Sequence, residues 1–338
     1  MHRLLKTFVL PALVGVVGSL ATVFAQAPPQ PTRAIVNVTG QLYRAQNNDY
    51  NTVFLVTPDG IIMTDPIDAD FSRWLKAELA TRFKVPVRYV LYTHNHWDHA
   101  SGGAIWADTA QFVGHANLRA ALALPAGNPP LPPADSKSDA NGDGLISAAE
   151  ATGGTKERFA AFDFNHDNLI SGAELARGSL NDVYPPTITF QDSHTIVLGG
   201  KAVRMISLGP AHSSDSALIY FPEERAIFSA DILQVRRLPG GVGPSVGAWI
   251  DAYKTMLALD FEHALAGHLL AGTKKDVQDL HQYLQDLSTG VAAGIAAGRT
   301  LPEIQKTLTL DAYKGFARWD TLRTGHIASV YATMKGTR

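Results

Sequence analysis

Three histidines and one aspartate lie within six consecutive residues, in the segment His94-Asn95-His96-Trp97-Asp98-His99. Imidazole nitrogens and carboxylate oxygens together are typical ligands of Zn²⁺, iron and manganese, whereas Ca²⁺ and Mg²⁺ prefer shells made of oxygen alone. A single histidine is common in a protein core, but this density of ligands is not typical of a surface loop. The segment therefore predicts a transition-metal centre.

The spacing of these residues predicts two metal positions. In an extended chain His94 and His96 project to the same side, so we expect them to bind one metal together. Asp98 and His99 follow a bend and are expected to hold a second metal about 3.5 to 4 Å from the first, as in two-metal hydrolases. Bound water then has its pKa lowered from near 15.7 toward about 7, and the resulting hydroxide attacks a carbonyl or phosphoryl centre. Asp98 is a candidate for passing a proton to the leaving group.

The order His-x-His-x-Asp-His, followed by Gly102-Gly103, resembles the metallo-β-lactamase superfamily. Three further motifs occur in the order found in that family: LGPAHSSD at 208–215, IFSAD at 227–231 and LAGH at 265–268. The resemblance covers most of the chain after residue 25. It implies that His94, His96 and His212 hold the first metal, that Asp98, His99 and His268 hold the second, and that Asp231 bridges them. It also implies two zinc ions, with iron or manganese as alternatives.

Two histidines outside these motifs compete for roles near the metals. His263 lies five residues before His268 and is the alternative for the last ligand, although His268 directly follows an apolar segment. His115 could support the metal site from behind, but a helix-capping or core role is favoured.

The elements around the cluster indicate an α/β fold. An apolar strand at 87–92 runs into the cluster, preceded by alternating strands over 33–65 and a helix at 69–83. A strand at 111–114 and a helix at 116–124 follow. Further strands are expected at 187–190, 203–208, 217–221, 225–229 and 264–266, and further helices at 246–259, 274–297 and 311–334. The resemblance implies a four-layer αββα sandwich, the metallo-β-lactamase fold, formed by 26–124 and 184–338.

The segment 125–183 interrupts this pattern and contains a repeated twelve-residue motif. The two copies are identical at 8 of 12 positions and match the EF-hand calcium loop, so we expect a small α-helical EF-hand pair that binds Ca²⁺. In the second copy Asn168 replaces the usual glycine, and asparagine tolerates the left-handed backbone required there. A structural clamp is favoured over a calcium sensor, and an acidic linker that binds nothing is the alternative. The expected ligands are Asp139, Asn141, Asp143, Leu145, Ser147 and Glu150 in the first loop, and Asp163, Asn165, Asp167, Leu169, Ser171 and Glu174 in the second.

The first 25 residues have the features of a signal peptide. His2, Arg3 and Lys6 precede an apolar run at 8–24, and small residues precede Gln26, so cleavage is expected near Ala25. A membrane anchor is the alternative, but Pro11 and several glycines interrupt the run. A periplasmic or secreted protein without a stable membrane anchor is therefore expected.

Composition limits the substrate. The 29 basic residues nearly balance the 31 acidic ones in a chain of 338, so no nucleic-acid partner is expected and a small-molecule substrate is favoured. The chain contains no cysteine, which excludes disulfides and thiolate ligands. No feature indicates a protein partner.

Together these features predict an exported metal-dependent hydrolase that uses a metal-activated hydroxide on an ester, thioester, lactone or amide. A true β-lactamase, a phosphodiesterase and a mononuclear iron dioxygenase on the same fold are the alternatives. Candidates for contact with the substrate are Trp97, within the cluster, and Arg236 and Arg237, soon after Asp231.

Overall fold

The computed structural model describes residues 31–243 and 245–336, so the predicted signal peptide at 1–25 lies outside the described residues. Within these two ranges, no helix combines the length and the apolar character needed to cross a membrane.

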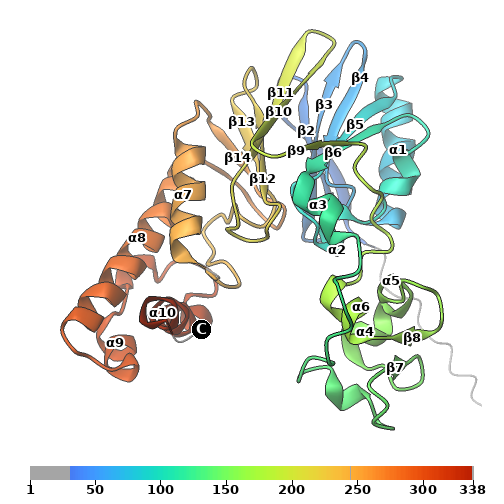
Figure 1. Ribbon diagram of the computed structural model, residues 1–338. Helices are drawn as coiled ribbons and strands as arrows, with labels where there is room; N and C mark the ends of the chain where they lie inside the picture. Colours follow the sequence, from blue (N-terminus) through green and yellow to red (C-terminus); the bar gives the residue numbers. More distant parts are fainter. Residues whose placement is uncertain (1–30, 244, 337–338) are drawn as a thin grey trace, which may run out of the picture. The chain divides into compact units, whose positions relative to one another are not determined.

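The alternating segment near the start of the described chain forms an antiparallel meander that begins the first sheet (Figure 1). Its strands are β1 (Arg33–Thr39), β2 (Leu42–Asn47), β3 (Tyr50–Thr57) and β4 (Gly60–Thr64). Three parallel strands continue the sheet in the order β1-β2-β3-β4-β5-β6-β9. They are β5 (Val87–Leu91), β6 (Gln111–His115) and β9 (Ile188–Phe190). The first sheet is therefore mixed.

The second sheet has six strands in chain order and is antiparallel except between β13 and β14. Its strands are β10 (Ser193–Leu198), β11 (Lys201–Ser207), β12 (Ala217–Phe221), β13 (Ala226–Phe228), β14 (His263–Leu265) and β15 (Ala271–Thr273). The fold is thus α/β, as predicted, and both of its sheets are mixed.

Helices cover the outer face of each sheet, which gives four layers. The first sheet carries α1 (Ala69–Phe83), the short α2 (Trp97–Ala100), the 3-10 turn η1 (Gly103–Trp106) and α3 (Ala116–Ala121). The second carries α7 (Val246–Leu257), α8 (Lys274–Ala296), α9 (Leu301–Thr307) and α10 (Trp319–Lys335). One apolar core lies between the sheets and one lies under each helical layer, so each helix buries an apolar face.

Local sequence signals account for the limits of α1. The Asp68 side chain accepts a hydrogen bond from the Phe71 amide at 2.7 Å and caps the first turn. The helix ends at Phe83, and the next residue, Lys84, has a left-handed φ of 54°. The predicted helix at 69–83 is confirmed.

The predicted helix at 311–334 is wrong in its first part. A 3-10 turn, η3 (Asp311–Tyr313), comes first, and α10 begins only at Trp319. Arg318, which lies between the two elements, has a left-handed backbone that separates them, and Leu310, directly before the 3-10 turn, is left-handed as well. Tyr313 and Phe316 still pack into the core around α8, so the apolar spacing looked continuous although the backbone is not.

Residues between α3 and β9 form a small separate core. They contain η2 (Ser136–Ser138), β7 (Ile146–Ser147), α4 (Gly153–Glu157), α5 (Phe159–Phe162), β8 (Leu169–Ile170) and α6 (Gly172–Arg177). β7 and β8 pair antiparallel, with Ile146 opposite Ile170, and both isoleucines are buried. The segment therefore joins its two repeated loops through one short ribbon.

Candidate metal centre

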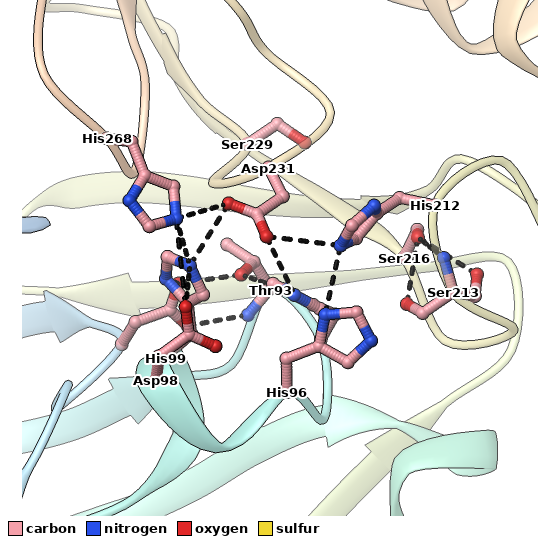
Figure 2. A network of polar contacts seen from close by, with 12 residues as sticks. Thr93, His96, Asp98, His99, His212, Ser213, Ser216, Ser229, Asp231 and His268 are labelled. Carbon is pink, nitrogen blue, oxygen red and sulfur yellow. Dashed lines mark hydrogen bonds and ion pairs between the residues drawn. The ribbon is translucent and has the colours of Figure 1, made fainter. Parts of the chain in front are cut away.

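The predicted metal ligands come together from segments that follow strands of both sheets, with Asp98 and His99 in the short helix α2 (Figure 2). Two groups of side chains place their ligand atoms within 4.8 Å of one another. The first group is His94, His96, His212 and Asp231, and the second is Asp98, His99, Asp231 and His268. These are the groupings that the family resemblance implied.

In the first group the ring nitrogens and a carboxylate oxygen converge on one point. The Nε2 of His212 lies 3.0 Å from His96 Nδ1 and 3.1 Å from Asp231 Oδ2. The Nε2 of His94 lies 3.8 Å from the same oxygen. His94 and His96 follow the end of β5 in irregular chain, so the alternation of a strand is not what brings them together, contrary to the sequence-based argument.

In the second group, histidine nitrogens converge in the same way on the other carboxylate oxygen of Asp231. The Oδ1 atom lies 2.8 Å from His268 Nε2 and 3.1 Å from His99 Nε2, and these two nitrogens are 3.1 Å apart. Asp98 Oδ2 lies 3.8 Å from both nitrogens. Each carboxylate oxygen of Asp231 thus faces a different group, which is the arrangement of a bridging ligand.

The residues fit two transition metals. Two Zn–N bonds of about 2.0 to 2.1 Å at a tetrahedral angle place their nitrogens about 3.3 Å apart. The imidazole pairs here lie at 3.0 and 3.1 Å. His94 Nε2 is buried and has no hydrogen-bond partner within the described part of the chain, which a metal would supply.

The electrostatics of Asp231 and His94 favour the protonation states that metal binding requires. Burial raises the pKa of Asp231, but the adjoining His99, His212 and His268 outweigh it and hold that pKa well below its ordinary value. Burial, followed by the neighbouring His99, holds the pKa of His94 well below its ordinary value. An ionised bridging carboxylate and a neutral imidazole are the ligand forms of these side chains. Burial lowers the pKa of His99, but Asp231 and Asp65 outweigh it and hold that pKa well above its ordinary value, so a metal must displace a proton there.

Asp65, which sequence reasoning missed, supports the centre from behind. This buried carboxylate accepts hydrogen bonds from the Thr93 amide at 2.8 Å and from Thr93 Oγ1 at 2.6 Å, and it lies 3.6 Å from His99 Nδ1. Because Thr93 Oγ1 donates its proton to Asp65, it accepts from His94 Nδ1 at 3.1 Å, which leaves Nε2 bare for a metal. An acidic residue at the end of β4, beside the strand that leads to the cluster, was the available signal.

Backbone contacts between the sheets hold the more distant ligands. The Asn51 amide donates to the Gly267 carbonyl at 2.7 Å, and the Leu269 amide donates to the Asp49 carbonyl at 2.8 Å, so the turn that carries His268 is tied to the start of β3. The Ala217 amide donates to the Thr93 carbonyl at 2.8 Å. The centre therefore forms only when both halves of the chain are folded.

The two competing histidines lie outside the metal groups. His263 is the first residue of β14 and belongs to neither group. His115 caps α3, where its Nδ1 accepts from the Asn117 amide at 3.1 Å, so the predicted helix-capping role is confirmed.

A cleft of about 310 Å³ opens beside the metal ligands. His212, Asp231 and His268 form one side of it. The other lining residues are Gln234, Arg237, Pro239, Gly240, Gly241, Trp249 and Arg318. Of the two arginines predicted to contact substrate, Arg237 lines this cleft. Arg236 does not, because its Nε lies 3.2 Å from Asp276 Oδ1.

Trp97 is not among the residues that line this cleft, and its ring stacks against an arginine of the inserted segment. The guanidinium of Arg158 stacks 4.1 Å from the Trp97 ring centre, and its Nη1 is buried without a hydrogen-bond partner among the described residues. Trp97 as a residue remains 40% exposed. Trp97 therefore links the inserted segment to the loop that carries His96 and Asp98.

A buried histidine fixes the loop at the edge of the cleft and should make stability depend on pH. His326 bonds to Tyr283 Oη at 2.8 Å and to the Pro239 carbonyl at 3.1 Å. Burial, assisted by Arg318, lowers the pKa of His326 to about 4. Its contribution to stability is therefore complete above the unfolded pKa of about 6.5 and is lost as the pH falls from there toward 4.

We expect the stability advantage of the wild type over a His326→Phe variant to shrink by about 1 kcal/mol between pH 7.5 and 5.5. Urea unfolding of both metal-free proteins measures this difference, in which the shared metal-binding histidines cancel. A constant difference between the two pH values would contradict the role given to His326.

Comparisons with known proteins agree with this geometry. A family model described as the metallo-beta-lactamase superfamily matches residues 48–268. A linear primary-alkylsulfatase from Pseudomonas sp. (strain ATCC 19151) is 25% identical over 192 residues, which cover 54% of this chain and 33% of that protein. The alpha subunit of a 2,4-dinitroanisole O-demethylase from Nocardioides sp. (strain JS1661) is 21% identical over 261 residues, which cover 74% of this chain and 61% of that protein. The chain thus spans less than two thirds of the length of either relative.

Two solved structures share the fold. The stereoselective inverting sec-alkylsulfatase Pisa1 from Pseudomonas sp. matches 90% of this chain with a TM-score of 0.62 and 14% identity, and 51% of that protein is covered. A metallo-beta-lactamase from Pontibacter korlensis matches 75% of this chain with a TM-score of 0.52 and 15% identity, and 99% of that protein is covered.

Proposed function

Since the chain belongs to the metallo-β-lactamase superfamily and carries His/Asp metal groups, it is a metallohydrolase, and we propose that it cleaves an ester, thioester, lactone or amide at a two-metal centre. The observation that carries this proposal is the position of Asp231, whose two oxygens face two separate groups of histidines. A carboxylate that bridges two metals holds them close enough together for one water or substrate molecule to contact both.

The residues divide the work of hydrolysis. His94, His96 and His212 would hold one metal, and Asp98, His99 and His268 the other, with zinc favoured and iron or manganese also compatible. When bound, the metals supply Lewis acidity and a water of lowered pKa. Asp98 lies at the edge of its group, 3.8 Å from the nearest nitrogens, and is the residue proposed to carry a proton to the leaving group.

A sulfate ester is a second candidate for the bond that is cleaved. The support is the likeness to the linear primary-alkylsulfatase, together with the match of the fold to Pisa1. β-Lactam hydrolysis, phosphodiester hydrolysis and iron-dependent oxygenation are the remaining alternatives, and metal content separates the last from the others.

The test combines elemental analysis of the purified protein with a panel of esters, thioesters, lactones, sulfate esters, phosphodiesters and nitrocefin. Two zinc ions per chain and turnover of an ester-type substrate are expected, with turnover lost in His96→Ala. One iron per chain, together with oxygen consumption, would show that the protein is an oxygenase and not a hydrolase. Turnover that survives His96→Ala would contradict the site.

We also propose that the inserted segment binds two calcium ions as an EF-hand pair. The support is the repeated geometry of its loops: Asp139 Oδ2 accepts from the Gly144 amide at 2.9 Å, and Asp163 Oδ2 accepts from the Asn168 amide at 3.0 Å. Asn168 has a left-handed φ of 64°, against 82° for Gly144, so asparagine adopts the backbone that the motif needs. The ribbon between Ile146 and Ile170 pairs the loops.

Calcium at 10 mM should stabilise the protein by about 2.7 kcal/mol for each site with a dissociation constant near 10⁻⁴ M. The double variant Glu150→Gln with Glu174→Gln should lose most of this gain, whereas Glu157→Gln, outside both loops, should keep it. Melting curves with calcium and with a chelator measure the difference. A melting temperature indifferent to calcium in the wild type would show that the loops are structural turns only.

A further inference from the structure

Two arginines from distant parts of the chain stand side by side in the wall of the cleft. The backbones around Arg237 and Arg318 are joined, because Arg237 forms a bridge with Ala317 and the Leu238 amide donates to the Ala317 carbonyl at 3.0 Å. Both side chains line the cleft that also contains His212, Asp231 and His268. The pair thus adjoins the metal ligands.

Neither guanidinium has a carboxylate partner within residues 31–243 and 245–336. By contrast, the adjacent Arg236 pairs with Asp276, with its Nε 3.2 Å from Asp276 Oδ1. Burial is the main cause of the lowered pKa of Arg237, and the neighbouring Arg318 lowers it further because two cations lie close together at a cost in free energy. An anion bound between them would remove this cost.

The backbone at Arg318 is also unfavourable for its residue type. Its φ of 68° is left-handed, a conformation that suits glycine and disfavours a long side chain. Left-handed backbone of this kind occurs at ligand-binding positions, and Arg236, outside the cleft, also has it, with a φ of 50°.

A third donor in the cleft lacks an acceptor. Trp249 is 1% exposed, and its Nε1 has no hydrogen-bond partner among the residues that the structure describes. A buried N–H without an acceptor is uncommon and is accounted for by a bound ligand or water. The cleft is therefore lined by two guanidinium groups and by a tryptophan whose buried N–H has no acceptor among the described residues.

We propose that Arg237 and Arg318 form an oxyanion-binding subsite, and that the substrate is an anionic ester whose carboxylate, sulfate or phosphate oxygens bind there while the scissile bond meets the metals. Arginine pairs with such groups through two parallel hydrogen bonds, which fixes orientation as well as charge. This inference rests on the proposed hydrolytic function and names the substrate class for it.

The test compares two esters that differ in one charge, mono-4-nitrophenyl adipate and 4-nitrophenyl hexanoate. Arg237→Gln and Arg318→Gln are each expected to raise KM for the anionic ester roughly 10- to 100-fold, while kcat/KM for the neutral ester changes less than about twofold. Arg318→Gly should have the same effect on KM without loss of stability, because glycine removes the backbone strain. Arg237→Lys should restore part of the affinity.

Arg236→Gln is the matched control. It removes the same charge at the neighbouring position, but the Arg236 side chain points to Asp276 and not into the cleft. Equal effects of all three glutamine variants, or equal losses for both esters, would overturn the subsite. A third substrate, 4-nitrophenyl sulfate, tests whether the two arginines bind the group that reacts. If they do, Arg237→Gln lowers kcat/KM most for this substrate.

A calorimetric measurement separates this inference from the proposed function. Adipate and sulfate ions should bind the zinc-loaded wild type at least about tenfold more tightly than Arg237→Gln. If the wild type binds these anions in an arginine-dependent way but hydrolyses no ester, the subsite stands and the proposed reaction fails. If it hydrolyses esters but arginine removal leaves anion binding unchanged, the reaction stands and the subsite fails.

Discussion

Replacement of Asp231 by alanine is expected to abolish both metal sites at once. Its two oxygens contact three of the histidines, at 2.8 to 3.1 Å, and no other side chain belongs to both groups. Without the shared carboxylate, five imidazoles remain with Asp98 as the one carboxylate of the two groups to balance the metals. We expect the metal content to fall from two per chain to below one, and turnover to fall on the order of 10³-fold or more.

Elemental analysis after dialysis and initial rates on the best substrate of the panel measure this result. Asp260→Ala is the control, because Asp260 is an exposed partner of Arg225 on the surface. Two tightly bound metals in Asp231→Ala would show that the carboxylate does not bridge, and each group would then have to be complete without it.

Gly267→Ala is expected to disable the second metal position without touching a ligand. A Cβ at this position would lie 2.7 Å from Ala230 Cα and 2.7 Å from His99 Cε1. Both neighbours are fixed, since the Gly267 amide donates to the Ala230 carbonyl at 3.1 Å and His99 is fully buried. The methyl group must therefore displace the His99 ring or the turn that carries His268.

We expect this variant to lose about 2 kcal/mol of stability through overpacking, and to bind one metal more weakly by roughly tenfold or more. Chelator competition and urea unfolding give the two quantities. Gly325→Ala, where a Cβ meets nothing within 4 Å, should leave both unchanged or slightly improve stability. Normal affinity for two metals in Gly267→Ala would mean that the His99 ring can move without cost.

The features that could be predicted from sequence were those determined locally. The helix at 69–83 has its own cap, and the apolar strand at 217–221 has the predicted limits, because adjacent residues fix both. The cluster at 94–99 was recognisable because four ligands stand together in sequence. The remaining ligands were placed through the order of family motifs and not through geometry.

The features that sequence reasoning missed depend on contacts between distant segments. Asp65 meets His99 only after β4 and β5 pair, and Arg318 reaches Arg237 only through a backbone bridge across some eighty residues of sequence. Arg236 and Arg237 are equivalent in the sequence, and only the position of Asp276 separates them. Local pattern cannot specify such neighbours, because tertiary packing chooses them.

The connection between β6 and β9 has a practical meaning for protein engineering. The two strands are adjacent and parallel, with Val113 opposite Ile188, so any chain that joins them must cross over, and about a dozen residues suffice. The present connection is far longer and has its own small core. It is therefore a natural acceptor position, at which a reporter or sensor module can replace the segment while both sheets stay intact. A graft that places a cationic side chain on Trp97, as Arg158 is placed here, would contact the segment that carries His96 and Asp98.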